Sequence, residues 1–497
     1  MSKSLKLLAF DLGSSNGRGI LGNFDGTRLN LEEIHRFGNS YIEMGGMIYW
    51  DILHLFANMK MTFQKFSASQ GGALSCFGID AWGNDYGLLD RNGQLLSNAR
   101  SARHTNERDM LEAHKIISGR DIFYRTGNSS YSINTLYQIY RRIRENDPAI
   151  ENARSMLMIP DLLAYFCTGE QHSEYTITTT TAMYNPTLRN WDLEMLGKFG
   201  ISEHILPPVT ASGTLCGSLL SNIADEASIN RIPYALVGSH DTASAVAALP
   251  IEHSDESYAF CSSGTWSLFG IESDNPIFSD EMYDSSFSNE GTVQGRFRPL
   301  VNITGLWLIQ EARREWKRMG KNYSWDDITG MAATAPALRS FFDPSHRDFF
   351  SVASMPRQIQ SYCLRTGQHI PETDGEIARC IYESLALKYR WALERLEALG
   401  NRHIDKLYIV GGGTQNLLLN QMVADSIGRP VITGPIEGAC VGNLLMQALA
   451  LGELKDLNEL RQVVRNSFDL QEYEPRPHIA QQWDDAYASY LRILKLH

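Results

Sequence analysis

The chain has 497 residues, of which 43% are hydrophobic and 21% charged, as in ordinary soluble globular proteins. This length predicts two large domains. The net charge of −12 argues against a nucleic-acid backbone or an anionic membrane surface as a partner. No apolar run has the length of a membrane span or of a signal-peptide core, and the seven scattered cysteines lack zinc spacing. We therefore expect a cytoplasmic protein with reduced thiols.

The N-terminal third predicts a sheet. Residues 5–10 and 19–24 read as strands around a glycine- and serine-rich turn that runs from Asp11 to Arg18. A third strand is predicted at 28–37, a helix from residue 51 and a short buried strand at 76–80. Helices and loops follow to about residue 200, and we interpret the threonines at 178–181 as a solvated or β-prone loop.

Near the middle of the chain, a predicted strand at 234–237 ends in a glycine turn, and a helix is predicted from Thr242. Asp241 would then lie just ahead of a helix N-terminus, where backbone N–H groups and the helix dipole favour a carboxylate. An isolated aspartate at such a place is usually only an N-cap. A simple cap does not need the ring of the neighbouring His240, so we interpret Asp241 as a functional residue.

The second half of the chain repeats the opening pattern. A strand at 257–261, a hydroxyl-rich turn at 262–265 and a returning strand at 266–271 suggest a duplicated architecture that holds a nucleotide between its halves. Further on we predict a long helix at 375–399, a strand at 406–410 and a helix at 417–427. The three glycines between these last two elements would let a ligand approach the backbone, although close helix–strand packing also explains them. The sequence contains no P-loop.

Together these segments resemble the FGGY family of sugar kinases, within the actin-like ATPase superfamily, over nearly the whole chain. The motifs that carry the resemblance are Asp11–Arg18, Gly78–Gly83, Asn134–Gln138, Ser239–Val246, Ser262–Leu268, Gly305–Leu308 and Val410–Gly413. The resemblance implies an α/β fold of two actin-like (ribonuclease H-like) domains with a ligand cleft between them. We expect residues 1–250 to bind sugar and carry the catalytic base, and residues 251–455 to bind nucleotide. A helical tail at 456–497 follows, and one arrangement for it is packing back on the first domain.

The resemblance also implies roles for individual residues. Asp241 would be the general base, and Asp11 would lie near the metal, Mg²⁺. The residues expected to contact the sugar are Gly83, His240, Asp241, Thr242 and Asn302. Those expected to contact ATP are Ser14, Ser15, Asn16, Gly17, Arg18, Thr265, Gln310 and Gly412. Two departures from the family pattern, Asn16 and the segment Asn84–Tyr86, leave sugar selectivity open.

The predicted function is ATP-dependent phosphorylation of a ketose, with L-rhamnulose as the first candidate. L-Fuculose is the nearest alternative, because the two 6-deoxyketoses differ at one hydroxyl and a few pocket contacts could exchange them. Another ketose of the FGGY kinases is a further alternative. A non-catalytic actin-like ATP-binding protein is a second alternative. The presence of both Asp11 and Asp241 argues against a pseudokinase, and the absence of an appended peptide-binding domain argues against a chaperone. The oligomeric state is not predicted.

Overall fold

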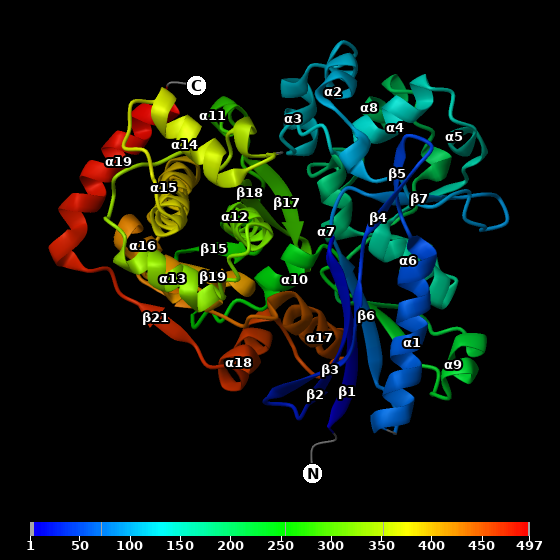
Figure 1. The fold of residues 1–497 in the computed structure, drawn as a ribbon. Helices are drawn as coiled ribbons and strands as arrows, with labels where there is room; N and C mark the ends of the chain where they lie inside the picture. Colours follow the sequence, from blue (N-terminus) through cyan, green and yellow to red (C-terminus); the bar gives the residue numbers. More distant parts are fainter. Residues whose placement is uncertain (1–3, 71, 254, 351, 496–497) are drawn as a thin grey trace. The chain divides into compact units, whose positions relative to one another are not determined.

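The computed structural model describes residues 4–70, 72–253, 255–350 and 352–495 (Figure 1). The chain divides into two compact units. The first contains Met1–Ser254, Glu272–Pro299 and Glu437–Phe468, and the second contains Asp255–Ile271, Leu300–Ile436 and Asp469–His497. Among the described residues, no helix has the length and apolar character needed to cross a bilayer.

A six-stranded sheet, in the order β3-β2-β1-β6-β14-β13, forms the centre of the first unit. β1 pairs antiparallel with β2, as the predicted strand–turn–strand pattern requires, and parallel with β6 on its other side. The strands are β1 (Leu5–Leu12), β2 (Asn16–Phe24), β3 (Leu29–Gly38), β6 (Cys76–Ala81), β13 (Thr214–Ser218) and β14 (Pro233–Leu236).

Both faces of this sheet are covered, which is why β1 reads as a continuous apolar run and not as an alternation. Leu8 and Phe10 belong to the apolar core that includes one face of α1 (Ile52–Gln70). Leu7 and Ala9, on the opposite face, belong to the core that includes α17 (Gly438–Ala450). Because side chains alternate along a strand, β1 joins two cores and fixes the residues at its C-terminal end between them.

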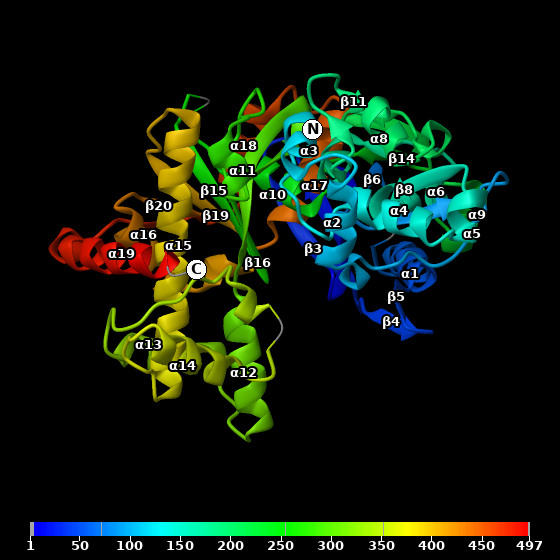
Figure 2. The same cartoon turned by 90° about the horizontal axis from the view of Figure 1, so that it is seen from above.

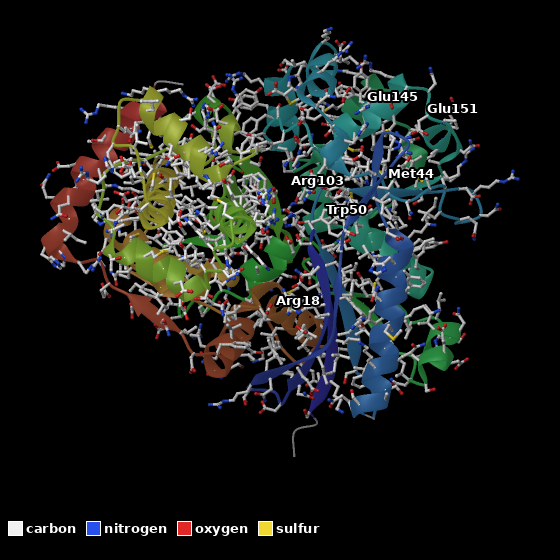
Figure 3. All side chains as sticks on the ribbon, viewed as in Figure 1. Arg18, Met44, Trp50, Arg103, Glu145 and Glu151 are labelled. Carbon is white, nitrogen blue, oxygen red and sulfur yellow. The ribbon has the colours of Figure 1, made fainter. Side chains whose placement is uncertain are left out.

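The remaining elements of the first unit surround this sheet. One of them, a hairpin of β4 (Tyr41–Met44) and β5 (Met47–Trp50), was not predicted, and it carries the exposed Met44 (Figure 3). The helices are α2 (Glu107–His114), α3 (Gly119–Thr126), α4 (Thr135–Arg144), α5 (Pro148–Asn152), α6 (Ile159–Thr168), α7 (Tyr175–Thr178), α8 (Leu193–Lys198), α9 (Ser221–Ala227), α10 (Asp241–Ala247), α11 (Asp280–Asp284) and α18 (Leu457–Ser467). The other strands are β4 (Tyr41–Met44), β5 (Met47–Trp50), β7 (Tyr86–Leu89), β8 (Ser155–Met158), β9 (Ser173–Glu174), β10 (Tyr184–Asn185), β11 (Asn190–Trp191), β12 (Val209–Thr210) and β17 (Ser288–Thr292).

The interpretation of the four threonines at 178–181 as a solvated or β-prone loop is wrong. They end α7 and form the following 3₁₀ turn, and all four are buried. Each hydroxyl donates to a carbonyl three or four residues back, at 2.6–2.8 Å. A hydroxyl that satisfies itself locally in this way can be buried without loss, so polar composition did not indicate exposure here.

The second sheet has seven strands, and β17 lies at its edge beside β18. Its other six strands follow the plan of the first sheet, in the order β18-β16-β15-β19-β20-β21. In each sheet the pairings along this order are antiparallel, antiparallel, parallel, parallel and antiparallel. The predicted duplication is therefore confirmed. The strands are β15 (Tyr258–Ser263), β16 (Trp266–Gly270), β18 (Arg296–Thr304, which begins in the first unit), β19 (Lys406–Val410), β20 (Val431–Thr433) and β21 (Gln471–Tyr473).

The 27-residue helix α15 passes beside this second sheet and packs against α13 and α16, while α19 packs on α16 (Figure 2). A capping box formed by Thr373 and Glu376 begins α15, and Asn401 in the left-handed conformation ends it. The helices are α12 (Trp307–Arg318), α13 (Trp325–Thr334), α14 (Met355–Arg365), α15 (Asp374–Gly400), α16 (Leu417–Ile427) and α19 (Ala480–Leu494).

Candidate active site

Asp11 lies near the C-terminal end of β1, directly opposite Arg18 on β2. The Arg18 guanidinium donates to Asp11 Oδ2 at 2.6 Å and forms a second, close ion pair with Glu437, just ahead of α17. Burial opposes the charge on Arg18, but Asp11 and then Glu437 offset it and the pKa of Arg18 is raised, so the guanidinium stays charged.

A third group joins this cluster, because the buried thiol of Cys440 donates to Asp11 Oδ2 at 3.2 Å. Ligand atoms of Asp11, Glu437 and Cys440 all lie within 4.8 Å of one another, so the three could hold a cation. Mg²⁺ prefers oxygen ligands, and the two carboxylates fit it while the thiol does not. Arg18 supplies the positive charge at this place in the described residues.

The turn between β1 and β2 is short, because Gly13 N–H donates to the carbonyl of Asn16 at 2.9 Å. Ser15 and Asn16 are exposed and Ser14 is partly exposed, so all three can meet a ligand. Gly17 is buried, and a Cβ there would lie 2.4 Å from the ring of Phe37. The packing around Gly17 therefore explains its glycine without a ligand.

Asp241 is the first residue of α10, and His240 is the N-cap, although its side chain makes no capping bond. The interpretation of Asp241 as a simple N-cap is thus not supported. Burial and then the charge of Asp11 raise the pKa of Asp241 to about 6. Thr242 N–H donates to Asp241 Oδ1 at 2.5 Å and holds the carboxylate in place. A carboxyl with this pKa is ionised at neutral pH and still basic enough to accept a proton.

His240 faces Gly83, and a Cβ at Gly83 would lie 3.0 Å from His240 Nε2. The other ring nitrogen, Nδ1, lies 2.9 Å from Nη2 of Arg298. Burial and then Arg298 lower the pKa of His240 well below its ordinary value, so the ring is neutral. The predicted sugar-contacting residues Gly83, His240, Asp241 and Thr242 therefore meet at the start of α10.

The segment Asn84–Tyr86, which departs from the family pattern, has a structural reason for its polar residues. Asp85 Oδ2 accepts from the indoles of Trp50 and Trp82, at 2.6 and 2.8 Å. The backbone carbonyl of Asn84 accepts from Gln138, a residue of the Asn134–Gln138 motif. These polar residues brace the loop that carries Gly83.

In the second unit, Thr265 and Gly412 lie on adjoining turns. Gly411 has φ +90°, and a Cβ there would lie 2.8 Å from the carbonyl of Ser263, while one at Gly413 would lie 2.0 Å from Ser263 Oγ. A Cβ at Gly412 would meet nothing within 4 Å. Two of the three glycines are thus required by packing, and only the exposed Gly412 faces open space.

The other two residues predicted in this unit lie on neighbouring elements. Trp307 N–H, at the start of α12, donates to the carbonyl of Thr265 at 3.2 Å, and Gln310 follows one turn later on the same helix. Asn302 lies on β18, opposite Leu268 on β16. Asn302 and Gln310 are both partly exposed, so each can contact a ligand.

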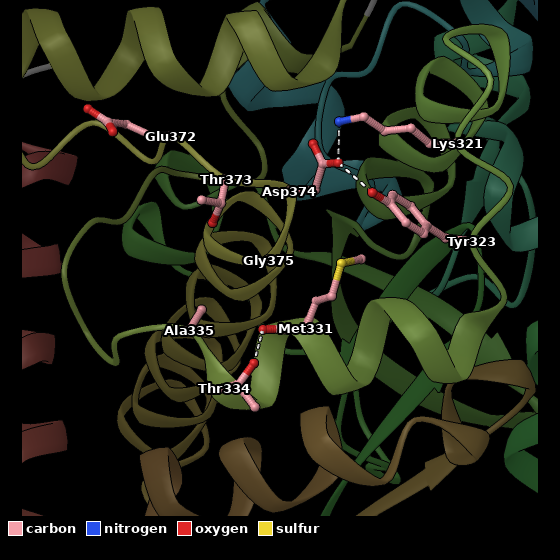
Figure 4. Close-up of a pocket in the computed structure, with 9 residues that line it drawn as sticks. All are labelled: Lys321, Tyr323, Met331, Thr334, Ala335, Glu372, Thr373, Asp374 and Gly375. Carbon is pink, nitrogen blue, oxygen red and sulfur yellow. Dashed lines mark hydrogen bonds and ion pairs between the residues drawn. The ribbon is translucent and has the colours of Figure 1, made fainter.

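A pocket of about 570 Å³ opens elsewhere in the second unit, at the start of α15 (Figure 4). Asp374 accepts there from Lys321 at 2.6 Å and from Tyr323 at 3.0 Å. None of the nine residues that line it belongs to the predicted site. Its one lysine is already neutralised by Asp374.

Three polar residues near the predicted site were missed from the sequence. Glu437 forms an ion pair with Arg18, and Arg298 lies at hydrogen-bond distance from His240. In both pairs the two residues are far apart in the sequence. Asp80 lies beside Asp11 in the sheet register, and burial and then the charge of Asp11 raise its pKa well above the ordinary value. Asp80 lies within the Gly78–Gly83 motif, which was the available signal. No local pattern marks the other two.

Comparisons with known proteins show the family of the chain. Residues 6–248 match the N-terminal domain and residues 259–451 the C-terminal domain of the FGGY family of carbohydrate kinases. The chain belongs to this family and is an ATP-dependent sugar kinase.

Several curated proteins that resemble the chain over most of its length are named rhamnulokinase. A rhamnulokinase from Bacteroides thetaiotaomicron is 39% identical over 98% of this chain and 99% of its own length, and one from Klebsiella pneumoniae is 39% identical over 95% and 94%. The motifs of the sequence also predict a resemblance to rhamnulokinase within the family, and these relatives confirm that resemblance.

Solved structures show the fold. A xylulose kinase from Lactobacillus acidophilus superposes with a TM-score of 0.81 at 16% identity, covering 99% of this chain and 98% of the other. A Plasmodium falciparum glycerol kinase with ADP gives a TM-score of 0.79 at 16% identity, covering 98% of both chains. The predicted α/β fold of actin-like domains is confirmed.

Proposed function

We propose that this chain transfers the γ-phosphoryl group of MgATP to L-rhamnulose and forms L-rhamnulose 1-phosphate in L-rhamnose catabolism. The names of its relatives support this substrate. L-Fuculose remains the alternative acceptor. The observation that carries the chemistry is Asp241, a carboxylate fixed by Thr242 and placed beside His240 and Gly83.

In the proposed reaction, a sugar hydroxyl attacks the terminal phosphorus of ATP. As the new O–P bond forms, the hydroxyl proton passes to the carboxylate of Asp241 and the bond between phosphorus and ADP breaks. The pKa of about 6 suits this role, because the carboxylate is mostly ionised before the reaction and accepts the proton without a large penalty.

The remaining assignments divide between the units. Ser14, Ser15, Asn16, Gly17 and Arg18 of the first unit would contact ATP, and so would Thr265, Gln310 and Gly412 of the second. Gly83, His240 and Thr242 would contact the sugar together with Asn302. We keep the division into a sugar-binding region at 1–250, a nucleotide-binding region at 251–455 and a tail at 456–497 as part of the proposal.

Asp11 would hold the divalent cation, Mg²⁺, with Glu437 as a second oxygen ligand. When bound with ATP, this cation neutralises charge that develops on the transferred phosphoryl group. Arg18 is bonded to both carboxylates, so it would exchange them for phosphate oxygens when the nucleotide binds. We also propose a cytoplasmic location and no nucleic-acid partner, since the net charge is −12.

A coupled ADP-release assay tests the substrate. L-Rhamnulose, L-fuculose, L- and D-xylulose, L-ribulose and glycerol are compared at matched concentrations, and kcat/KM is measured for each. We expect L-rhamnulose to give the highest value. A higher value for L-fuculose would select the alternative, and no ADP release with any of them would refute the function.

A further inference from the structure

Arg298 is a fully buried cation whose position the catalytic proposal leaves unexplained. Its Nη2 donates to Glu290 Oε2 at 2.7 Å and lies 2.9 Å from His240 Nδ1. Its Nε and Nη1 are buried without a hydrogen-bond partner. A buried ion pair with unsatisfied nitrogens rarely adds stability over an apolar pair of similar volume. We therefore look for the role of Arg298 in its contact with His240.

Only one placement of the ring proton of His240 is compatible with this contact. A guanidinium has only N–H donors and stays charged, so it cannot accept a hydrogen bond. His240 Nδ1 must accept and can carry no proton. In a neutral imidazole the single ring proton then resides on Nε2, which becomes a donor.

The direction of Nε2 is fixed as well. The main-chain N–H of His240 donates to Thr176 Oγ1 at 3.2 Å, and its backbone forms a bridge to Ala81, the last residue of β6. Nε2 lies beside Gly83, and a Cβ there would come within 3.0 Å of it, so the glycine leaves this nitrogen uncovered by a side chain. No hydrogen bond occupies Nε2 within the described part of the chain.

We propose that Arg298 is a positioning residue that fixes His240 as the Nε2–H tautomer, so that Nε2 donates a hydrogen bond to an oxygen of the ketose above Gly83. This inference rests on the proposed sugar site. It assigns His240 a definite role as a neutral donor and rules out a role as a base or as an imidazolium.

The charges around the ring agree with this role. Asp241 Oδ1, 3.5 Å from Nδ1, would favour an imidazolium, and so would Glu290 and Glu174, which is bonded to the preceding backbone N–H. Arg298 opposes all three from hydrogen-bond distance. Burial, and then Arg298, lower the pKa of His240 well below its ordinary value, so the tautomer persists at neutral pH.

The tautomer is tested first, without any sugar. Nitrogen-15 spectra of the histidine side chains of the full chain report which ring nitrogen carries the proton, and a His240→Gln variant identifies the resonances of His240. We expect an unprotonated Nδ1 and a protonated Nε2, and the Nε2 resonance should shift when L-rhamnulose is added. A proton on Nδ1, or a charged ring near neutral pH, would overturn the inference whatever the kinase assay gives.

Kinetics then test the positioning role. The double variant Arg298→Met/Glu290→Gln removes the donor without leaving a lone buried carboxylate. We expect KM for the ketose to rise roughly three- to tenfold, the effect of one hydrogen bond, while kcat changes little. Arg298→Lys keeps a cationic donor and should restore most of the affinity.

A double-mutant cycle separates this role from general damage to the fold. In a His240→Ala background, the double variant should raise KM no further, because Arg298 acts through the ring that is now absent. If the two effects multiply instead, or if Arg298→Lys behaves like the methionine variant while still folded, Arg298 is not positioning His240.

Discussion

The replacement of Asp241 by asparagine should separate activity from stability. Asparagine keeps the shape and can still bond the sugar hydroxyl, but it has no basic oxygen. Binding of sugar and ATP should survive while kcat falls by a factor on the order of 10² to 10⁴, the usual cost of losing a general base.

The stability of the same variant should rise. Burial and the charge of Asp11 raise the pKa of Asp241 from 3.8 to about 6, so the folded state holds this proton more tightly than the unfolded state. Wild-type stability should therefore fall as pH rises through this window, and the full penalty applies above it. Two pH units correspond to about 3 kcal/mol. Because 34% of the side chain is exposed, water screens part of this cost, and we expect about 1–2 kcal/mol.

Urea denaturation of the free protein checks the predicted stability, and the coupled kinase assay checks the predicted loss of kcat. Asp241→Asn should be more stable than wild type near neutral pH, and the difference should vanish below a pH of about 4. Asp80→Asn is the matched control: Asp80 also has a raised pKa but is fully buried, so this variant should keep most of its turnover. Unchanged kcat in Asp241→Asn would remove the catalytic assignment, and lower stability near neutral pH would refute the electrostatic reasoning.

Three further predictions follow from single contacts. Gly412→Val should weaken ATP binding in calorimetry with little change in Tm, whereas Gly413→Val should lower Tm because its Cβ meets a side chain at 2.0 Å; equal ATP affinity for Gly412→Val and wild type would refute the placement. Gly83→Ala should raise KM for the ketose more than KM for ATP, since the methyl group fills the space beside His240, and equal changes would contradict this. Glu437→Gln should weaken divalent-cation binding and so raise the cation concentration needed for half-maximal activity; an unchanged requirement would exclude Glu437 as a ligand.

Much of the fold could be predicted because local patterns and tertiary packing agree along the chain. The strand at 406–410 and the helix at 417–427 occur as predicted, and the long helix differs by one residue at each end. The hairpin of β4 and β5 was missed because its exposed, mixed sequence has no strand period that burial would impose. The threonine turn was misread because composition does not reveal hydroxyls that bond to their own backbone.

The candidate site was predictable only where its residues lie in local motifs. Asp11 lies near the end of a strand, Gly83 comes two residues after a strand and Asp241 begins a helix, and strand and turn patterns mark such positions. Glu437 and Arg298 belong to segments that lie far from Arg18 and His240 in the sequence and that folding brings to them. Their contacts depend on long-range packing, which a single sequence does not display.

The alternation of the chain between its units has a consequence for synthesis on the ribosome. The chain passes from one unit to the other five times, and the first unit is complete only at Phe468. One face of its sheet is covered by α17, which is translated more than 350 residues after β6, so the apolar core that includes Leu7 and Ala9 stays open until then. Neither unit can finish folding well before the other. A chain that stops before Glu437 should accordingly be recovered as aggregate, whatever the intrinsic stability of its sheets.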